Sequence, residues 1–282
     1  ANVTTTISDE SIPGSEDTVY AVIAVDKAST PEGGVLTYTV SLVDKDGNPV
    51  TLPTGKSIAV DLAWSGTAAG GADTSTLPSS VTLTSTNKTT FTVSALDDYF
   101  AEGSEPLIAT ITKVTDTNGT FEKAAVGTTN TASSAITDES TPTSEDTVTL
   151  KVVAVDANGT IIGDGSANSG AESQTTYYKV IALDPAGNQI SATGTASVTF
   201  TPGTASTADF TPSKTTVNIG EVFSAALVDD RLADNGEKFT VNLTSNTVSG
   251  FEKVVQSSAN VTTTISDEST PTSEDTVYVK LT

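Results

Sequence analysis

The sequence predicts an all-β protein made of tandem two-sheet sandwiches in an extended array. A thirteen-residue block occurs three times, beginning at positions 7, 136 and 265, so successive copies lie 129 residues apart. Self-similarity at a fixed period indicates an array of like units. Short runs that alternate apolar and polar residues recur along each unit, separated by Gly, Pro, Asn and Asp, and no stretch sustains a helical period.

The length of the period predicts that each unit folds by itself. Solenoid repeats of about 20 to 45 residues share a core with their neighbours, whereas a period of 129 residues matches an independent domain. We expect two whole sandwiches, at 17–139 and 146–268, flanked by a last-strand stub at 1–10 and a first-strand stub at 274–282. The first stub repeats 259–268 without a change, so we interpret the chain as a cut from a longer array.

Seven strands are expected in each unit, which fits a two-sheet sandwich. In the first unit they lie at 18–26, 35–44, 57–64, 79–85, 89–96, 106–114 and 132–137. In the second unit they lie at 147–156, 175–184, 192–200, 214–220, 222–229, 238–245 and 259–265. The alternation is clearest where Leu36, Tyr38 and Val40 interleave with polar residues, so one face of that strand is expected to meet a core and the other water.

Two kinds of loop stand out between the strands. DKDGN at 44–48 and DPAGN at 184–188 carry the Asp, Gly and Asn of tight turns. The first also resembles the opening of a calcium loop, but the later Glu of an EF-hand is missing, so a plain turn is favoured. The second unit has a longer connection at 156–173 than the first has at 26–34, which is either a tolerated surface insertion or a local functional element.

Composition limits the function and points to a cation. With 35 acidic and 13 basic residues the net charge is −22, which disfavours nucleic-acid and anionic-membrane partners and favours bound cations. The chain has no His and no Cys, so zinc and iron are poor candidates and oxygen-seeking calcium remains. No apolar run reaches the roughly 18 residues of a membrane span, and 1–10 lacks the pattern of a signal peptide, so we expect a soluble fragment.

Two equivalent loops concentrate carboxylates. DDYFAEGSE at 97–105 and DDRLADNGE at 229–237 carry acids at the same first, second, sixth and ninth positions, whereas four of the five residues between them differ. Such crowded carboxylates repel one another in the absence of a cation, and Ca²⁺ takes about 6 to 8 oxygen ligands. The pattern therefore favours calcium sites over solvated acidic turns.

These loops belong to a stretch, 203–245, that resembles the Calx-β family. It has a GTA segment followed by Asp and an aromatic residue, a Gly-containing turn, and a strand ending in Asp-Asp and Glu-x-x-Glu; 66–112 is similar, although Thr74 replaces the aromatic. The resemblance implies Ig-like sandwiches that bind several Ca²⁺ ions at one end. In the first unit it implies the ligands Glu32, Asp73, Asp97, Asp98, Glu102, Glu105, Asp138 and Glu139. In the second it implies Glu172, Asp209, Asp229, Asp230, Asp234, Glu237, Asp267 and Glu268, where the shorter Asp234 departs from the pattern and is expected to weaken or rearrange one site.

The tandem context resembles the extender repeats of large bacterial RTX (repeats-in-toxin) adhesins. Near-identical linkers, the lack of Cys and Met, and strong acidity are shared features. The resemblance implies a type I secreted, extracellular spacer on the bacterial surface, which calcium stiffens so that it projects an adhesive tip for attachment and biofilm formation. The linker carries four acids through which calcium would bridge neighbouring repeats: Asp138, Glu139, Glu145 and Asp146. The alternative is a flexible acidic linker, restrained only by prolines such as Pro142.

Two other functions compete with the spacer. A module that itself binds glycan, protein or a host surface would use the insertion, at Gly163 to Glu172, or aromatics such as Trp64 and Tyr99. An enzyme is not expected, because a carboxylate pair duplicated in each repeat, without His or Cys, is better explained by metal ligation. We expect a monomer, without nucleic-acid partners and without membrane insertion.

Overall fold

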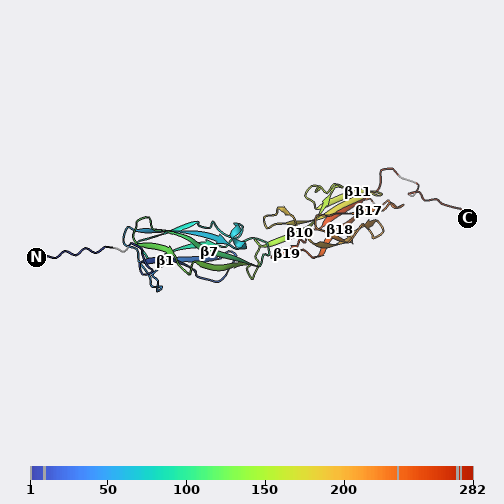
Figure 1. Cartoon of the computed structure of the whole chain (residues 1–282). Coiled ribbons are helices and arrows are strands. Elements are labelled where there is room, and N and C mark those ends of the chain that lie inside the picture. Colours follow the sequence, from blue (N-terminus) through green and yellow to red (C-terminus); the bar gives the residue numbers. More distant parts are fainter. Residues whose placement is uncertain (1, 9–10, 234, 271–272, 274, 282) are drawn as a thin grey trace. The chain divides into compact units, whose positions relative to one another are not determined.

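The computed structural model describes residues 2–8, 11–233, 235–270, 273 and 275–281. It confirms an all-β fold, in which the described residues form strands and one short 3-10 helix, Thr67–Gly70 (Figure 1). The chain divides into two compact units. The first comprises Ala1–Asp98 and Glu102–Thr141, and the second comprises Tyr99–Ala101 and Pro142–Thr282.

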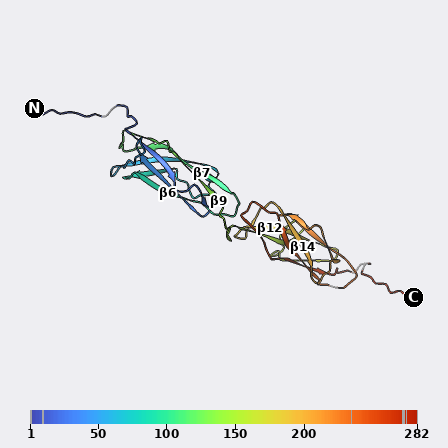
Figure 2. The ribbon, with the colours of Figure 1, turned by 90° about the horizontal axis from the view of Figure 1, so that it is seen from below.

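The first unit is a sandwich of two sheets. Its strands are β1 (Thr18–Val25), β2 (Thr30–Pro31), β3 (Val35–Val43), β4 (Ser57–Ser65), β5 (Ser80–Thr84), β6 (Lys88–Ser94), β7 (Ser104–Thr115), β8 (Lys123–Val126) and β9 (Thr131–Thr137). One sheet has the order β6-β3-β1-β8 and the other the order β2-β9-β7-β4-β5. Figure 2 labels β6 of the first sheet and β7 and β9 of the second. The pairs β1–β8 and β2–β9 are parallel, whereas the other pairs are antiparallel.

The second unit repeats this plan with additional short strands. Its strands are β10 (Thr147–Val155), β11 (Ala167–Ala171), β12 (Thr175–Leu183), β13 (Gln189–Ile190), β14 (Thr195–Pro202), β15 (Phe210–Pro212), β16 (Thr216–Asn218), β17 (Val222–Leu227), β18 (Lys238–Asn246), β19 (Lys253–Gln256) and β20 (Val261–Ser266). The sheet orders are β15-β17-β12-β10-β19, with β13 beside β12, and β11-β20-β18-β14-β16. Each strand expected from the sequence has a counterpart here. The short strands β2, β8, β11, β13, β15 and β19 were not expected, because two to five residues are too few to show an alternation.

Each sandwich is closed by a buried tyrosine that joins its two sheets. Tyr38 on β3 is fully buried, as its place in the alternating run predicts, and its hydroxyl lies 2.8 Å from Ser134 Oγ on β9 of the opposite sheet. Tyr178 on β12 makes the equivalent contact of 2.6 Å with Thr263 Oγ1 on β20. Because a buried hydroxyl needs a partner, these contacts fix how the two sheets pack.

The insertion of the second unit has a structural role. Its first part, 156–166, turns back along the edge of β10, where Ile162 N donates to Ala154 O at 3.0 Å and Ala154 N donates to Gly165 O at 2.9 Å. Val153, Val155 and Ile181 form a second, smaller buried cluster outside the main core, and the insertion adjoins it, because Gly165 lies against Val153. The insertion then continues as β11, which runs parallel to β20 in the opposite sheet.

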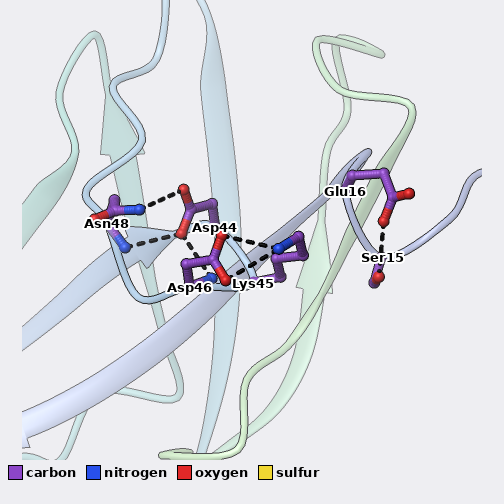
Figure 3. A network of polar contacts seen from close by, with 6 residues as sticks. All are labelled: Ser15, Glu16, Asp44, Lys45, Asp46 and Asn48. Atoms are coloured by element: carbon purple, nitrogen blue, oxygen red, sulfur yellow. Dashed lines mark hydrogen bonds and ion pairs between the residues drawn. The ribbon is translucent and has the colours of Figure 1, made fainter.

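The DKDGN segment forms a turn closed by its own side chains (Figure 3). Asp44 Oδ1 accepts hydrogen bonds from Asp46 N at 2.9 Å and Asn48 N at 2.8 Å, and Asp44 Oδ2 accepts one from Asn48 Nδ2 at 2.9 Å. Lys45 pairs with Asp46 at 2.9 Å, and in the same view Ser15 Oγ donates to Glu16. The hydrogen bonds that Asp44 accepts, chiefly those from Asn48, lower its pKa. Both oxygens of Asp44 are therefore already used, which agrees with the interpretation as a turn.

The two expected stubs form no strands in the described residues. Residues 2–8 have the same sequence as 260–266, yet only the second copy pairs, as β20 between β18 and β11. Residues 275–281 are likewise outside any strand. A strand needs partners as well as propensity, so identical residues differ in structure. The described part of the chain has no helix with the length and apolar character needed to cross a membrane.

Candidate metal centre

In the first unit, strand ends bring the predicted acids to one end of the sandwich. Glu32 directly follows β2 and Asp138 directly follows β9, and these strands are parallel neighbours, so both residues leave the sheet at the same end. Glu32 N donates to Thr137 O at 2.9 Å, which continues the pairing by one step. The acidic loop 97–105, between β6 and β7, closes over this end.

Asp138 and Glu32 hold the acidic loop in place. Asp138 Oδ1 accepts hydrogen bonds from Glu102 N at 3.2 Å and Gly103 N at 2.9 Å, and Glu32 Oε2 accepts one from Asp98 N at 3.2 Å. Burial raises the pKa of Glu32 to about 7, and the carboxylates of Asp98, Asp138 and Asp97 add to this rise, while the bond from Asp98 N opposes it. The loop thus places several negative charges around one partly buried carboxyl group.

Asp73, Glu102 and Glu105 form a second group in the first unit. Each offers an oxygen, and these atoms lie within 4.8 Å of one another. Asp73 is buried, with 9% of its surface exposed. The pKa of Glu102 and that of Glu105 are both raised, first by burial and then by the charge of Asp73. This group has the crowding that a cation relieves.

The GTA motif shapes this second group. Gly66 has φ +103°, and a Cβ at this position would collide with the carbonyl oxygen of Pro106, which follows Glu105. Only glycine therefore lets the two backbones approach here. Thr67, which sequence reasoning missed, hydrogen-bonds the Glu105 side chain. The sequence signal for Thr67 was its place in the motif GTA, which recurs at 203–205.

Three acids come together at the end of the second sandwich. Glu172 follows β11, Asp229 follows β17 and Glu268 follows β20, and one oxygen of each lies within 4.8 Å of the others. Glu172 N donates to Ser266 O at 2.9 Å, as Glu32 N does to Thr137 O. Their counterparts in the first unit are Glu32, Asp97 and Glu139.

Two oxygens in this second-unit group lack protein partners. Asp229 Oδ1 and Glu268 Oε2 are buried and accept no hydrogen bond from the described residues, although Ser173 Oγ reaches the other oxygen, Asp229 Oδ2, at 3.2 Å. Glu172 beside them has only 6% of its surface exposed. Buried carboxylate oxygens without a donor are costly, and a bound cation would offset that cost.

Other predicted ligands of the second unit are placed in turns. Asp209, the counterpart of Asp73, accepts hydrogen bonds from Ser206 N at 2.5 Å and Ser206 Oγ at 3.2 Å. Asp230 Oδ1 accepts one from Leu232 N at 2.6 Å. Glu237 immediately precedes β18, and Asp234 lies outside the described residues. The described residues of the second unit, which do not include Asp234, therefore show no group like that of Asp73, Glu102 and Glu105.

The linker acids differ in burial and in hydrogen bonding. Asp146 Oδ2 accepts a hydrogen bond from Thr143 N, and Thr147 Oγ1 donates to Thr143 O at 2.7 Å, so this acid closes a turn before β10. Glu145 is exposed. Buried carboxylate oxygens without a hydrogen-bond partner among the described residues occur at Glu139, Asp146 Oδ1 and Asp267 Oδ1. Their assignment as ligands stays a prediction.

The two aromatic candidates for a binding surface are occupied within the fold. Trp64 is half-buried, its Nε1 donates to Pro78 O at 2.9 Å, and its ring meets that of Tyr38 edge-on at 5.1 Å. Tyr99 is half-buried, and its ring centroid lies 4.6 Å from that of Phe100. Trp64 therefore supports the core of the first unit.

No family model matches this chain, and no curated protein matches it. Solved structures with a similar fold include the apo-form Calx CBD1 domain, at 17% identity and TM-score 0.31 over 42% of this chain and 97% of that one. The calcium binding domain CBD12 of CALX1.1 is similar at 11% identity and TM-score 0.32, over 86% and 98% of the two chains. The Escherichia coli adhesin FdeC is similar at 16% identity and TM-score 0.28, over 90% of this chain and 65% of that one. At these values the similarity says nothing about what this chain binds.

Proposed function

We propose that each unit binds calcium at its acidic end and that the chain is an extender of a bacterial cell-surface adhesin. The observation that carries the proposal is the group Glu172, Asp229 and Glu268. Three separate chain segments bring these carboxylates within 4.8 Å, and two of their oxygens are buried without a partner among the described residues. The same residue types recur at the equivalent positions of the first unit.

The donor set fits calcium. The groups contain carboxylates and no nitrogen or sulfur ligand, since the chain has no His and no Cys. Calcium takes oxygen ligands in flexible geometry, whereas zinc prefers imidazole and thiolate.

Bound calcium would supply positive charge and a cross-link between segments. The residues that would hold it are Glu32, Asp97 and Glu139 with Asp73, Glu102 and Glu105 in the first unit, and Glu172, Asp229 and Glu268 in the second. Asp138 acts as a positioning residue, because it fixes the loop backbone at Glu102 and Gly103. The acidic loops would otherwise be opened by their own repulsion.

The extender role rests on the tandem sequence. Asp138 and Glu139 end one unit, and Glu145 and Asp146 begin the next only a few residues later, so the chain itself keeps them within about 25 Å. We propose that calcium shared by these acids makes the linker stiff, and that rigid units in series give an RTX-type adhesin its reach during attachment and biofilm formation. Each sandwich would add roughly 30 Å.

Thermal unfolding with and without a chelator tests the calcium proposal. A ligand at 100 times its Kd stabilises a fold by about 2.7 kcal/mol, which for a unit of this size raises Tm by about 10 °C. We expect chelation to lower Tm by at least this much and magnesium to restore less of it than calcium. Identical melting curves in calcium and in chelator would end the proposal.

X-ray scattering tests the extender role separately. We expect chelation to change the scattering profile from that of a stiff pair of units to that of two flexibly linked units. An unchanged profile would contradict the stiffening without contradicting calcium binding. Binding to a glycan or host surface that disappears when 160–172 is deleted would instead favour a binding module.

A further inference from the structure

Two Asn-Gly pairs of the chain lie in the same type of turn, Asp-x-Asn-Gly-Thr, at 116–120 and 156–160. In the first, Asp116 Oδ1 accepts a hydrogen bond from Asn118 N at 3.2 Å. In the second, Asp156 Oδ1 accepts one from Asn158 N at 2.9 Å. Both glycines have positive φ, +57° and +84°. The two pairs therefore form a matched comparison within one chain.

The two asparagine side chains differ in how they are held. Asn118 Oδ1 accepts hydrogen bonds from Ser57 N at 3.0 Å and Ser57 Oγ at 3.2 Å. Asn158 is exposed, and its side-chain amide makes no hydrogen bond with any of the described residues. The Asn158 amide is thus free to rotate towards the backbone nitrogen of Gly159, whereas the Asn118 amide is restrained.

We propose that Asn158 is a site of spontaneous deamidation and that the reaction loosens the insertion of the second unit. The Gly159 nitrogen, after losing its proton to base, bonds to Asn158 Cγ, the Cγ–Nδ2 bond breaks, and Nδ2 leaves as ammonia. Water then opens the cyclic imide at either carbonyl, which gives aspartate or isoaspartate. No oxidant or reductant is needed. Glycine permits the attack because it has no Cβ beside its nitrogen.

Local opening of the turn must come first. Gly159 N donates to Asp156 O at 3.0 Å, and this bond has to break before the nitrogen can attack. The turn is exposed, and such turns open without unfolding the core. Neither step requires calcium, so the inference stands or falls independently of the proposed function.

The product would disturb two contacts of the turn that opens the insertion, one with Lys179 of β12 and one within the turn. Gly159 O accepts a hydrogen bond from Lys179 Nζ at 2.8 Å, and Thr160 N donates to Asp156 Oδ1 at 2.9 Å. Isoaspartate adds a carbon to the backbone between these contacts, and either product adds a negative charge next to Asp156. The segment that covers Val153 and Val155 would therefore be held less firmly.

Peptide mapping by mass spectrometry of the intact chain, aged at neutral and mildly alkaline pH in chelator and in calcium, tests the proposal. The peptide with Asn158 should gain the mass difference between NH₂ and OH, with isoaspartate present, several-fold faster than the peptide with Asn118, and faster at the higher pH. Asn158→Gln should abolish the change at 158. Ser57→Ala should speed the change at Asn118 and leave Asn158 unaltered.

Hydrogen exchange of the aged protein tests the consequence. We expect faster exchange at Val153 to Val155 in aged wild type and no such change in aged Asn158→Gln. Equal or faster modification at Asn118, an unmodified Asn158, or a glycan mass on Asn158 would each overturn the proposal. If hydrogen exchange at Val153 to Val155 were unchanged after complete deamidation of Asn158, the proposed loosening of the insertion would be refuted.

Discussion

Asp73 and Asp209 hold the same place in two repeats, yet their carboxylates are used differently. Asp73 lies buried against Glu102 and Glu105, whereas Asp209 accepts hydrogen bonds from the backbone and side chain of Ser206. The segment before Asp73 contains two glycines, and the segment before Asp209 contains a serine that folds back on it. Asp209 is thus held by a serine of its own loop, whereas Asp73 faces other acids.

This difference gives a paired test of the calcium proposal. Asp73→Asn removes repulsion in the apo protein and a ligand in the loaded one, so we expect the Tm of the first unit to rise in chelator and to fall in calcium. Asp209→Asn should lower the Tm of the second unit similarly in both conditions, by the loss of hydrogen bonds worth about 1 kcal/mol. Differential scanning calorimetry checks both, and a calcium-dependent effect of Asp209→Asn as large as that of Asp73→Asn would contradict it.

The buried tyrosine gives a prediction on pH. Burial raises the pKa of Tyr178 to about 12, while its hydrogen bonds with Thr176 and Thr263 oppose the rise. Since the folded pKa is above the unfolded value of 10.0, the stabilisation is complete below pH 10 and is lost as pH rises towards 12. Tyr178→Phe should destabilise the second unit by about 1 to 3 kcal/mol at neutral pH and make its stability less sensitive to alkali.

Denaturant unfolding at neutral and alkaline pH measures this effect. Tyr38→Phe is the matched control, because it should act on the first unit only. Equal alkaline sensitivity in wild type and Tyr178→Phe would show that another group governs it.

At the scale of elements, the insertion and the face that it covers have changed together. Val153, which the insertion contacts, and Ile181 belong to the buried cluster on the outer face, and the equivalent positions of the first unit, which has no such insertion, are Ala24 and Ser41. Side chains on the outer face are thus apolar where the insertion adjoins them, and small or polar where they face water.

Removal of the cover should therefore be costly. Replacing 157–166 by a short Gly-Ser turn exposes Val153, Val155 and Ile181, and we expect a loss of about 2 to 5 kcal/mol in the stability of the second unit. Adding Val153→Ala and Ile181→Ser should restore solubility without restoring stability. Chemical denaturation and light scattering check the two effects, and wild-type stability after the replacement would show that the insertion is a dispensable loop.

The long strands and the acidic loops could be predicted from the sequence, but the short strands and the conformation of individual turns could not. The alternation around Tyr38 predicted its burial, and the duplicated positions of 97–105 and 229–237 predicted which loops gather carboxylates. The short strands β8 and β19 escaped it, because Lys123–Val126 and Lys253–Gln256 become strands only beside β1 and β10. The capture of Asp209 by Ser206 depends on the shape of a turn, which residue types alone do not define.

For the whole molecule, the dominant property is a net charge of −22. Charge repulsion between surface carboxylates weakens as salt shortens the Debye length from about 10 Å at 0.1 M to about 3 Å at 1 M. We expect added KCl to raise the Tm of both units clearly in chelator and only slightly in saturating calcium, as scanning calorimetry would show. A salt response of equal size in the two conditions would mean that calcium leaves the repulsion in place.

The wide spacing of three second-unit acids along the chain has a kinetic consequence. Glu172, Asp229 and Glu268 come from segments spread over most of the unit, and Glu268 follows its last strand, β20. All three residues can bind a cation only after that strand has docked, and we expect this docking to come late in folding. Calcium would then lengthen the lifetime of a completed unit by slowing its unfolding while leaving its rate of folding nearly unchanged.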